Sequence, residues 1–133
     1  MSSRNNRTAG HGWELMSIKA LRPIFPKAVS SRAESRNRDA AKVDICHTGF
    51  LNVQCKNYSK PIKYDEVLDE MPNEKGQMNV IFDRQTRKHP TSGRFMKKGE
   101  YVHMHLEDFI TLISKTHEAD NNINVDTVDT FGK

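Results

Sequence analysis

The stretch that decides the fold is Lys42-Val43-Asp44-Ile45-Cys46-His47-Thr48-Gly49-Phe50-Leu51-Asn52-Val53-Gln54-Cys55-Lys56. Apolar and polar residues alternate on both sides of His47-Thr48-Gly49, which is typical of two β-strands joined as a hairpin. A three-residue hairpin loop needs a left-handed conformation at its last position, and glycine adopts that conformation at little cost. The spacing therefore predicts a β-hairpin with a three-residue loop that ends at Gly49.

The loop length fixes which residues face one another across the two strands. A three-residue loop pairs Cys46 with Phe50 and therefore Asp44 with Asn52, and Gln54 then lies diagonally across from Asp44. Side chains alternate between the two faces of a strand, so the second strand has a core face made by Leu51, Val53 and Cys55. An acid, an amide oxygen and the Lys56 ammonium are expected on the opposite face. From this pattern alone, a half-exposed strand pair with solvated polar residues is the simpler interpretation.

Asp44, followed by a strand that ends in Gln54-Cys55-Lys56, resembles the D…(D/E)-x-K signature of the PD-(D/E)xK nuclease superfamily, with glutamine in the acidic position. Together with Glu14 on an upstream helix and a Ser/Arg-rich segment before Asp44, the chain is similar to archaeal-type Holliday junction resolvases. Similar small nucleases are also encoded by phages. The resemblance covers roughly residues 10–115. It implies an α/β fold with a restriction-endonuclease-like core, in which helices flank a mixed, mostly antiparallel sheet.

The resemblance also implies a metal centre that hydrolyses phosphodiester bonds in DNA. Asp44 is expected to be the principal ligand of Mg²⁺ or Mn²⁺, and Glu14 a second carboxylate that acts directly or through water. Gln54 is expected to coordinate through its amide oxygen, and Cys55 through its backbone carbonyl. Lys56 is expected to orient or help deprotonate the attacking water and to offset charge on the phosphate. Gln54 replaces a carboxylate, which should weaken metal binding.

A helix is predicted over residues 13–22, where Trp13, Met16, Ile18, Ala20 and Leu21 sweep out a broad apolar arc. At 100° per residue, Glu14 falls inside this arc, between Leu21 and Ile18. A carboxylate that faces inward needs a cation, a metal or hydrogen-bond donors, because burying it alone is costly. A second interpretation of Glu14 is an acid near the helix N-terminus that is favoured by the helix dipole.

Two basic segments are candidate contacts for phosphate. Residues 30–39 lack an apolar anchor and are expected to form a flexible loop, while residues 84–94 are expected to form a cationic loop. In the resolvases a serine on the approach to Asp44 assists catalysis, and Ser35 and Ser31 are the candidates here, with Ser35 preferred. The predicted nucleic-acid-binding residues are Arg32, Arg36, Arg38, Lys60, Arg87 and Lys88. For both segments the alternative is solvated charge without a ligand.

The rest of the chain predicts a short strand over residues 27–30 and a helix over residues 64–71 whose outer face is acidic. A core strand is expected over residues 78–82. Later strand segments are expected over residues 94–96 and 100–104, with a break at Lys97-Lys98-Gly99 between them. The last helix is expected over residues 105–116, with an inward face made by Leu106, Phe109, Ile110 and Ile113.

Composition sets the limits of these interpretations. The chain has 133 residues, a net charge of +4, 35% hydrophobic residues and a mean hydropathy of −0.76. This composition is typical of one domain with a modest core, and the charge favours a polyanionic partner. A basic arm is expected over residues 1–9, a nuclease-like domain over 10–116 and a disordered tail over 117–133. Cys46 and Cys55 lack zinc-site spacing and are expected to be free thiols in a reducing compartment.

No apolar run is long enough to span a bilayer and no signal-peptide pattern is recognised, so a cytoplasmic protein of a bacterial or archaeal cell, or of its virus, is expected. A resolvase must act on two strands, so the resemblance implies a homodimer on branched or junction DNA. Two alternatives to a structure-selective endonuclease stay open. One is a catalytically weak or inactive DNA-binding protein of the same fold, and the other is a protein-interaction factor that uses the acidic helix face.

Overall fold

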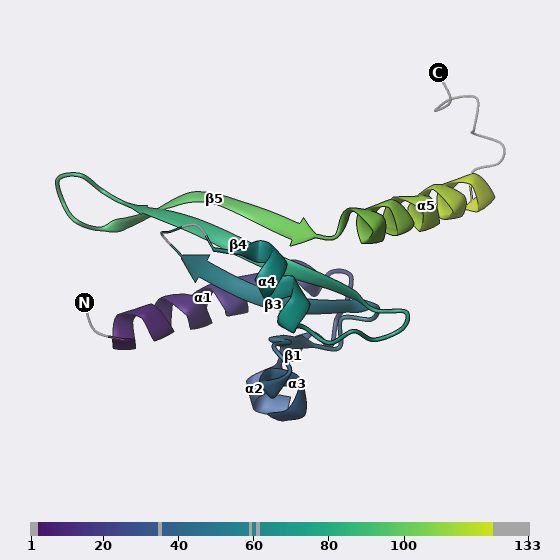
Figure 1. The fold of residues 1–133 in the computed structure, drawn as a ribbon, viewed down its shortest axis with the longest axis horizontal. Helices are drawn as coiled ribbons and strands as arrows, with labels where there is room; N and C mark the ends of the chain where they lie inside the picture. The colour runs from purple at the N-terminus through teal and green to yellow at the C-terminus, as the bar shows by residue number, and fades with distance from the viewer. Residues whose placement is uncertain (1–2, 35, 59, 61, 124–133) are drawn as a thin grey trace, which may run out of the picture.

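The computed structural model describes residues 3–34, 36–58, 60 and 62–123, with side chains left out at 3–9, 36, 38 and 121–123. Its fold is α/β, as predicted: a five-stranded sheet with helices against both faces (Figure 1). The strands are β1 (Val29–Ser30), β2 (Ile45–Cys46), β3 (Leu51–Tyr58), β4 (Met78–Lys88) and β5 (Phe95–Met104), and they lie side by side in this order. All neighbouring pairs are antiparallel except β3 and β4, which are parallel.

The parallel pair follows from the connection between its strands. Helix α4 (Tyr64–Glu70) carries the chain from the end of β3 back to the start of β4, as a crossover between parallel strands must do. Its inward residues Tyr64, Val67, Leu68 and Met71 pack around Ile81 of β4. The helix with an acidic outer face was predicted from the sequence and is confirmed. Met71 and Pro72 follow the helix, and its acidic residues face outward.

The first helix covers the other face of the sheet. Helix α1 (Ser3–Leu21) buries Trp13, Ile18 and Leu21 against a core that contains Ile45, Val53 and Val80. It begins ten residues before the predicted start, so the expected basic arm is helical from Ser3. The buried arc is also rotated from the predicted one: Met16 and Ala20 are exposed, while Ser17 is buried.

The hairpin has a longer loop than predicted. Gly49 is left-handed at φ 58°, as expected, but His47 is left-handed as well at φ 64°, and β3 begins only at Leu51. Ile45 therefore pairs with Val53, and the predicted pairing of Asp44 with Asn52 and of Cys46 with Phe50 is wrong. The change is a shift of two residues, which preserves the faces of a strand. Leu51, Val53 and Cys55 accordingly pack in the core, as predicted.

Two expected loops have regular structure instead. Residues 30–39 contain helices α2 (Ser31–Glu34) and α3 (Arg36–Ala40), which begin where the Ser31 amide donates to the Asp44 carbonyl at 2.9 Å. The cationic segment after Phe82 continues β4 as far as Lys88, because β5 pairs with it along its whole length. Only residues 89–94 form the turn, and the predicted break at Lys97-Lys98-Gly99 is a register shift within a continuous β5.

Helix α5 (Leu106–Ile123) runs past the predicted end at Thr116 and projects beyond the sheet (Figure 1). The prediction that Leu106, Phe109, Ile110 and Ile113 face inward is wrong. Their exposed fractions are 74%, 46%, 49% and 44%. Residues 124–133 of the expected tail lie outside the described part of the chain. Across the described residues, no helix is both long and apolar enough to cross a membrane.

Candidate active site

Glu14 is the buried carboxylate of helix α1. Its side chain is 3% exposed, which confirms that it lies inside the buried arc. Ser30 Oγ donates to Glu14 Oε1 at 2.7 Å, and the Arg32 guanidinium donates to Glu14 Oε2 at 3.0 Å. One hydroxyl and one half-exposed cation therefore hold the carboxylate in place, which is what an inward acid needs.

Asp44 lies beside β3, just before β2 begins. Its amide donates to the Val53 carbonyl at 2.8 Å, and its Oδ2 accepts a hydrogen bond from the Cys55 amide at 2.8 Å. These two bonds lie on either side of Gln54 along β3. A side-chain oxygen of Asp44 thus takes a position in the hydrogen-bond ladder that a backbone carbonyl would otherwise take. Strand β2 accordingly begins only after Asp44, at Ile45.

The electrostatics of Asp44 are unfavourable for its charged form. Burial raises the pKa of the Asp44 carboxyl above its ordinary value of 3.8, and repulsion from Glu14 and Asp39 raises that pKa further. The hydrogen bond from the Cys55 amide and the attraction of Lys56 oppose this rise. Burial is therefore the main obstacle to ionising Asp44, and repulsion between the Glu14 and Asp44 carboxylates adds to it.

The backbone of Cys55 points to the side of β3 on which Asp44 accepts its hydrogen bond. In a strand, the N–H and C=O of one residue point to the same side, so the Cys55 carbonyl points toward the edge where its amide meets Asp44. The thiol points into the core beneath α1. Burial raises the pKa of this thiol to about 12, a hydrogen bond with Ser17 lowers it, and the charges of Asp44 and Glu14 raise it. The thiol is therefore neutral, and the carbonyl is the atom of Cys55 available for a ligand.

Gln54 and Lys56 extend from the face of β3 that also bears α4. Their register partners on β4 are Ile81 and Asp83, which lie on that face. Gln54 is 6% exposed, and its Oε1 has no hydrogen-bond partner among the described residues. A buried amide oxygen without a donor is costly, so this atom suits a ligand. The Lys56 ammonium lies 5.7 Å from the centre of the Tyr58 ring and attracts Asp44.

The oxygen atoms around Asp44 are of the kind that Mg²⁺ and Mn²⁺ prefer. The Asp44 and Glu14 carboxylates repel each other, and the Cys55 carbonyl points to the side of β3 where Asp44 binds. The unpartnered Gln54 amide oxygen is on the face of β3 that bears α4, whereas Glu14 belongs to α1 on the other face. No three His, Cys, Asp or Glu side chains gather into a metal-binding group in the part of the chain described here. The candidate set contains only two such side chains, and its other two donors are an amide and a carbonyl. Oxygen donors of these kinds are the ones that a hard divalent cation binds.

The residues predicted to bind nucleic acid are spread over three places. Arg32 is half-exposed and pairs with Glu14, while Lys60 is exposed after β3. Arg87 and Lys88 are exposed at the end of β4. Ser35 lies outside the described residues, as do the side chains of Arg36 and Arg38.

Two serines before Asp44 have structural positions that bear on the site. Ser31 is fully buried, and its Oγ has no partner among the described side chains and backbone. Ser30, which sequence reasoning missed, donates to Glu14. Its position at the end of the predicted first strand, two residues from Arg32, is the signal that could have identified it.

A second polar cluster lies on the α4 face and was not expected from the sequence. Asp83 is fully buried and accepts hydrogen bonds from the Tyr64 hydroxyl at 2.7 Å and from Gln85 Nε2 at 2.9 Å. His103 Nε2 lies 2.9 Å from Asp83, and the His103 ring stacks on Tyr64 with 3.6 Å between centroids. Burial and the Asp83 carboxylate raise the pKa of Tyr64 to about 12. The alternation of Ile81, Asp83 and Gln85 was the available signal.

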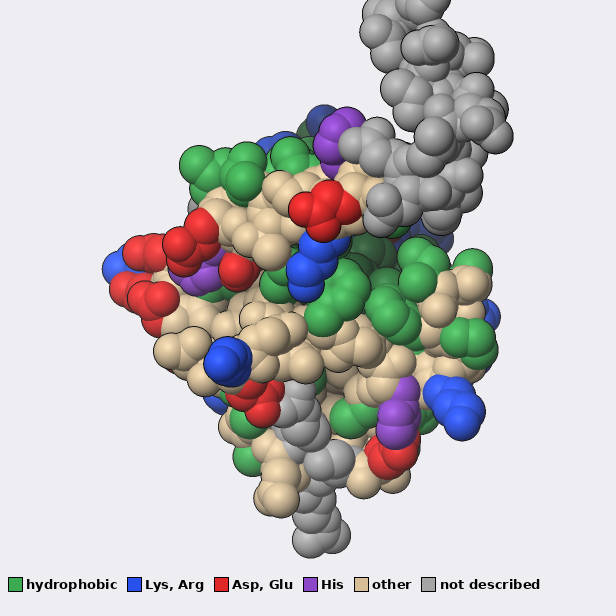
Figure 2. All heavy atoms as spheres, turned by 90° about the vertical axis from the view of Figure 1, so that its right-hand side faces the viewer, with side chains coloured by type: hydrophobic (Ala, Val, Ile, Leu, Met, Phe, Trp, Pro, Cys, Tyr) green, Lys and Arg blue, Asp and Glu red, His purple; other side chains and the backbone are tan. Residues whose placement is uncertain are grey.

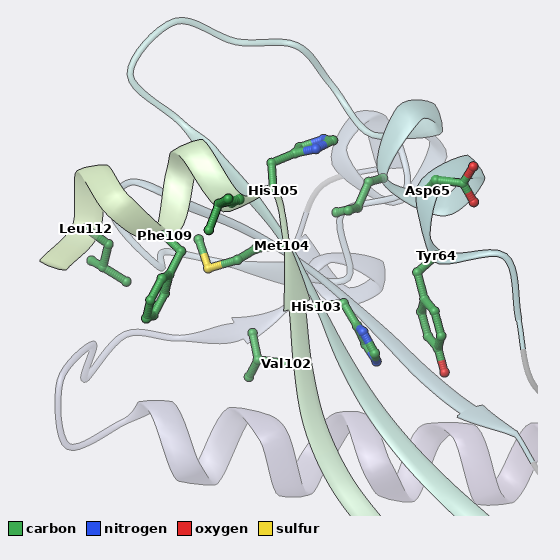
Figure 3. A pocket seen from close by; sticks show the side chains of 10 residues that line it. Tyr64, Asp65, Val102, His103, Met104, His105, Phe109 and Leu112 are labelled. Atoms are coloured by element: carbon green, nitrogen blue, oxygen red, sulfur yellow. The ribbon is translucent and has the colours of Figure 1, made fainter.

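This cluster borders an apolar groove of about 660 Å³ between α4, β5 and α5. Val102, Met104, Phe109 and Leu112 line its apolar part (Figure 3). His103 and His105 point in different directions from the two sides of β5's end (Figure 3), so they do not converge on a common ligand.

Comparisons with protein families, with curated proteins and with solved structures find no match to this chain. The described geometry and the sequence motif therefore carry the functional interpretation.

Proposed function

We propose that the protein is a divalent-metal-dependent DNA endonuclease, selective for branched DNA and similar to the Holliday junction resolvases. The observation that carries this proposal is the repulsion between the carboxylates of Glu14 and Asp44, the second of which binds the Cys55 amide of β3. The unpartnered oxygen of Gln54 and the attraction between Asp44 and Lys56 support it. A restriction-endonuclease-like core is part of the same proposal.

Each residue has a role in the proposed hydrolysis. Asp44, Gln54 and the Cys55 carbonyl would hold Mg²⁺ or Mn²⁺, and the ion would supply a water of lowered pKa and an electrophile for the phosphate. Glu14, already held by Ser30 and Arg32, acts through a water molecule. Lys56 orients the attacking water and offsets negative charge that develops on the phosphate. Ser35 assists on the approach to Asp44.

The basic side chains bind the DNA backbone in this proposal. Exposed cations contact phosphates without reading the sequence. This binding releases counterions from the DNA, so it weakens as the salt concentration rises. Lys60, Arg87 and Lys88 are exposed, and Arg32 is half-exposed beside Glu14. The remaining proposed contacts are Arg36 and Arg38.

The test is cleavage of end-labelled four-way junctions and linear duplexes with Mg²⁺, Mn²⁺ or a chelator. We expect the protein to cut the junction only with a divalent ion. Asp44→Asn and Lys56→Ala should each lower the cleavage rate by about 1,000-fold, since each removes a group that stabilises charge in the transition state. Both variants should retain salt-dependent DNA binding.

Asp65 of α4 and Lys63, the residue that precedes this helix, provide matched controls. Asp65→Asn and Lys63→Ala make the same chemical changes at the surface, where Lys63 is 79% exposed, and should leave the rate unchanged within about twofold. Equal cutting by the Asp44→Asn variant and the parent, or cutting that persists in chelator, contradicts the proposed centre.

Gln54 favours a second candidate function, a DNA-binding protein of the same fold that has lost catalysis. Glutamine in the acidic position removes one negative charge from the proposed metal site, which lowers the attraction for a cation. The same experiment separates the two, because this candidate binds the junction and leaves it intact at every metal concentration. A protein-interaction factor, suggested by the acidic face of α4, neither binds nor cuts the junction.

We also propose that a second copy of the chain covers helix α5, which gives the two centres that a junction requires. Leu106, Phe109, Ile110 and Ile113 form an exposed apolar stripe along α5. Figure 2 shows apolar side chains gathered on the side of the molecule from which α5 projects in Figure 1. Two such helices packed antiparallel bring Glu107 of each copy to Lys115 of the other, which complements their charges.

Sedimentation equilibrium tests this proposal. The parent should have twice the 15.3 kDa mass of the chain. Ile110→Lys with Ile113→Lys should have the mass of one chain, while Ile24→Lys, at an apolar residue with 71% exposure outside α5, should stay dimeric. A parent of monomeric mass, or a dimer that withstands both lysines, contradicts it.

A further inference from the structure

Strands β4 and β5 extend beyond the rest of the sheet as a two-stranded arm (Figure 1). The last residue of β3, Tyr58, pairs with Gln85, and beyond this point β4 pairs with β5 alone. We call residues 86–98 the hairpin arm. The register shifts at its base, between Gln85 and Thr86, and such a bulge bends and twists a strand pair. The arm therefore projects from the body at a defined angle and can reach a partner.

The tip of the arm is held by a set of local hydrogen bonds. His89 Nδ1 accepts from the amides of Thr91 and Ser92, both at 3.1 Å. The His89 amide donates to the Arg94 carbonyl at 2.7 Å, and Gly93 closes the turn in a left-handed conformation. A turn with so many satisfied backbone groups has few conformations to lose on binding, which favours affinity. The tip is preorganised.

The charge of the arm has one sign. Residues 86–98 contain five cations and no Asp or Glu, and the cations are Arg87, Lys88, Arg94, Lys97 and Lys98. Lys97 lies 3.9 Å from Glu100, outside the arm, and both side chains are exposed enough for solvent to weaken that pair. A surface of this kind is complementary to a polyanion.

Two apolar side chains lie among these cations. Phe95 is 52% exposed and Met96 is 37% exposed. Phe95 is opposite Lys88, and Met96 is opposite Arg87. Because directly opposite residues of an antiparallel pair share a face, each face of the arm presents one apolar side chain next to one cation. The arm has no helix against it to cover either side chain (Figure 1).

An exposed apolar side chain within a cationic surface is complementary to nucleic-acid bases flanked by phosphates. Aromatic side chains stack on unpaired bases, and Phe and Met also serve as wedges between base steps. Paired, stacked bases offer no open face, whereas bases at a branch point do. We propose that the hairpin arm inserts into DNA at its branch, with Phe95 stacked on a base at one face of the arm and Met96 in contact with a neighbouring base at the opposite face, while the arm cations hold the flanking phosphates.

This inference rests on the proposed DNA-binding function and adds to it the residues that select branched over linear DNA. The occupant is DNA with unstacked bases. An acidic protein surface would use the same cations and would not need Phe95.

The experiment measures binding in a chelator, so that cleavage does not intervene. A four-way junction with 2-aminopurine at the branch is compared with a linear duplex of the same sequence. We expect the parent to change the 2-aminopurine fluorescence. Phe95→Ala with Met96→Ala should abolish that change and weaken junction binding about tenfold, while duplex binding stays within about twofold. Phe95→Tyr should retain both signals, because tyrosine also stacks.

Ile24→Ala is the matched control, since Ile24 is an exposed apolar residue outside the arm with 71% exposure. It should behave as the parent, and unchanged duplex binding by the double variant shows that the arm still folds. Unchanged junction binding by the double variant overturns the inference, and so does an equal loss on both DNAs. In those cases metal-dependent cutting by the parent leaves the proposed function intact. If the parent protein binds no DNA, both the proposed function and the inference about the hairpin arm are wrong.

Discussion

Asp44 and Asp83 are two carboxylates of the same sheet with opposite surroundings. Asp83 is fully buried and has three partners, Tyr64, Gln85 and His103. Asp44 has the Cys55 amide as its hydrogen-bond donor and is repelled by a second carboxylate, Glu14. Asp83 thus has three hydrogen-bond partners within the chain, whereas Asp44 has one donor and a carboxylate that repels it. Burial alone does not separate a structural acid from a ligand-binding one; the count of donors does.

The largest expected effect is on the satisfied acid. Asp83→Ala leaves the Tyr64 hydroxyl, Gln85 and His103 without their buried acceptor, so it should lower the free energy of unfolding by about 3 kcal/mol. Urea denaturation followed by circular dichroism measures this loss. Asp65→Ala, at an exposed acid on α4, should change stability by less than about 0.5 kcal/mol. A loss below about 1 kcal/mol for Asp83→Ala would mean that its three partners are well solvated without it.

Replacing Asp44 should raise the free energy of unfolding in the absence of metal, whereas replacing Asp83 lowers it. The pKa of Asp44 is raised in the folded state, so the folded protein binds its proton more tightly than the unfolded chain does. This contribution favours folding at pH values below the unfolded-state pKa and is lost as pH rises through the folded-state pKa.

The Asp44→Asn variant has no carboxyl at this position, so it does not lose stability as pH rises through the pKa of Asp44. Its amide oxygen can still accept the hydrogen bond from the Cys55 amide. Its melting temperature in chelator should therefore exceed the parent's at pH 7, by less than the Asp83→Ala effect, and match the parent's below the ordinary pKa of 3.8. Thermal melts at several pH values measure the difference. A variant that is less stable than the parent at pH 7 and equally stable at pH 3 would mean that the pKa of Asp44 is lowered by folding and not raised.

The smallest expected effect concerns the number of negative charges around Asp44. Gln54→Glu should lower the Mn²⁺ concentration at half-saturation by about tenfold, because ligand charge tunes cation affinity. Trp13, the only tryptophan in the chain and next to Glu14, gives a fluorescence signal for the titration. Gln77→Glu, outside the site, adds the same charge and should leave the affinity unchanged. An unaltered affinity in Gln54→Glu would exclude Gln54 from the proposed ligand set.

The sequence predicted those features that depend on local periodicity. The 100° spacing of α1 placed Glu14 inside the buried arc, and the alternation along β3 separated Cys55 from Gln54 and Lys56. Gly49 was correctly expected in a left-handed conformation. Each of these depends on residues within one element, so the sequence pattern contains the necessary information.

The features that the sequence did not predict depend on contacts between distant segments. The strand register changed because His47 also became left-handed and lengthened the loop. Residues 84–88 read as a cationic loop, but pairing with β5 extended them as a strand. The apolar stripe of α5 was expected to face the core, and no described segment of this chain covers it. The cluster around Asp83 joins α4, β4 and β5, which only the folded chain brings together.

The neutral thiol of Cys55 has a consequence for metal selectivity. Thiolates attract zinc, cadmium and other soft ions strongly, and a cysteine between two acids could have done so here. With a pKa of about 12, this sulfur keeps its proton throughout the cellular range. Burial, with a smaller contribution from the charges of Asp44 and Glu14, therefore opposes the ionisation that a thiophilic metal ion would need at this position. In the proposed metal centre, a neutral Cys55 thiol would leave coordination of the ion to oxygen atoms.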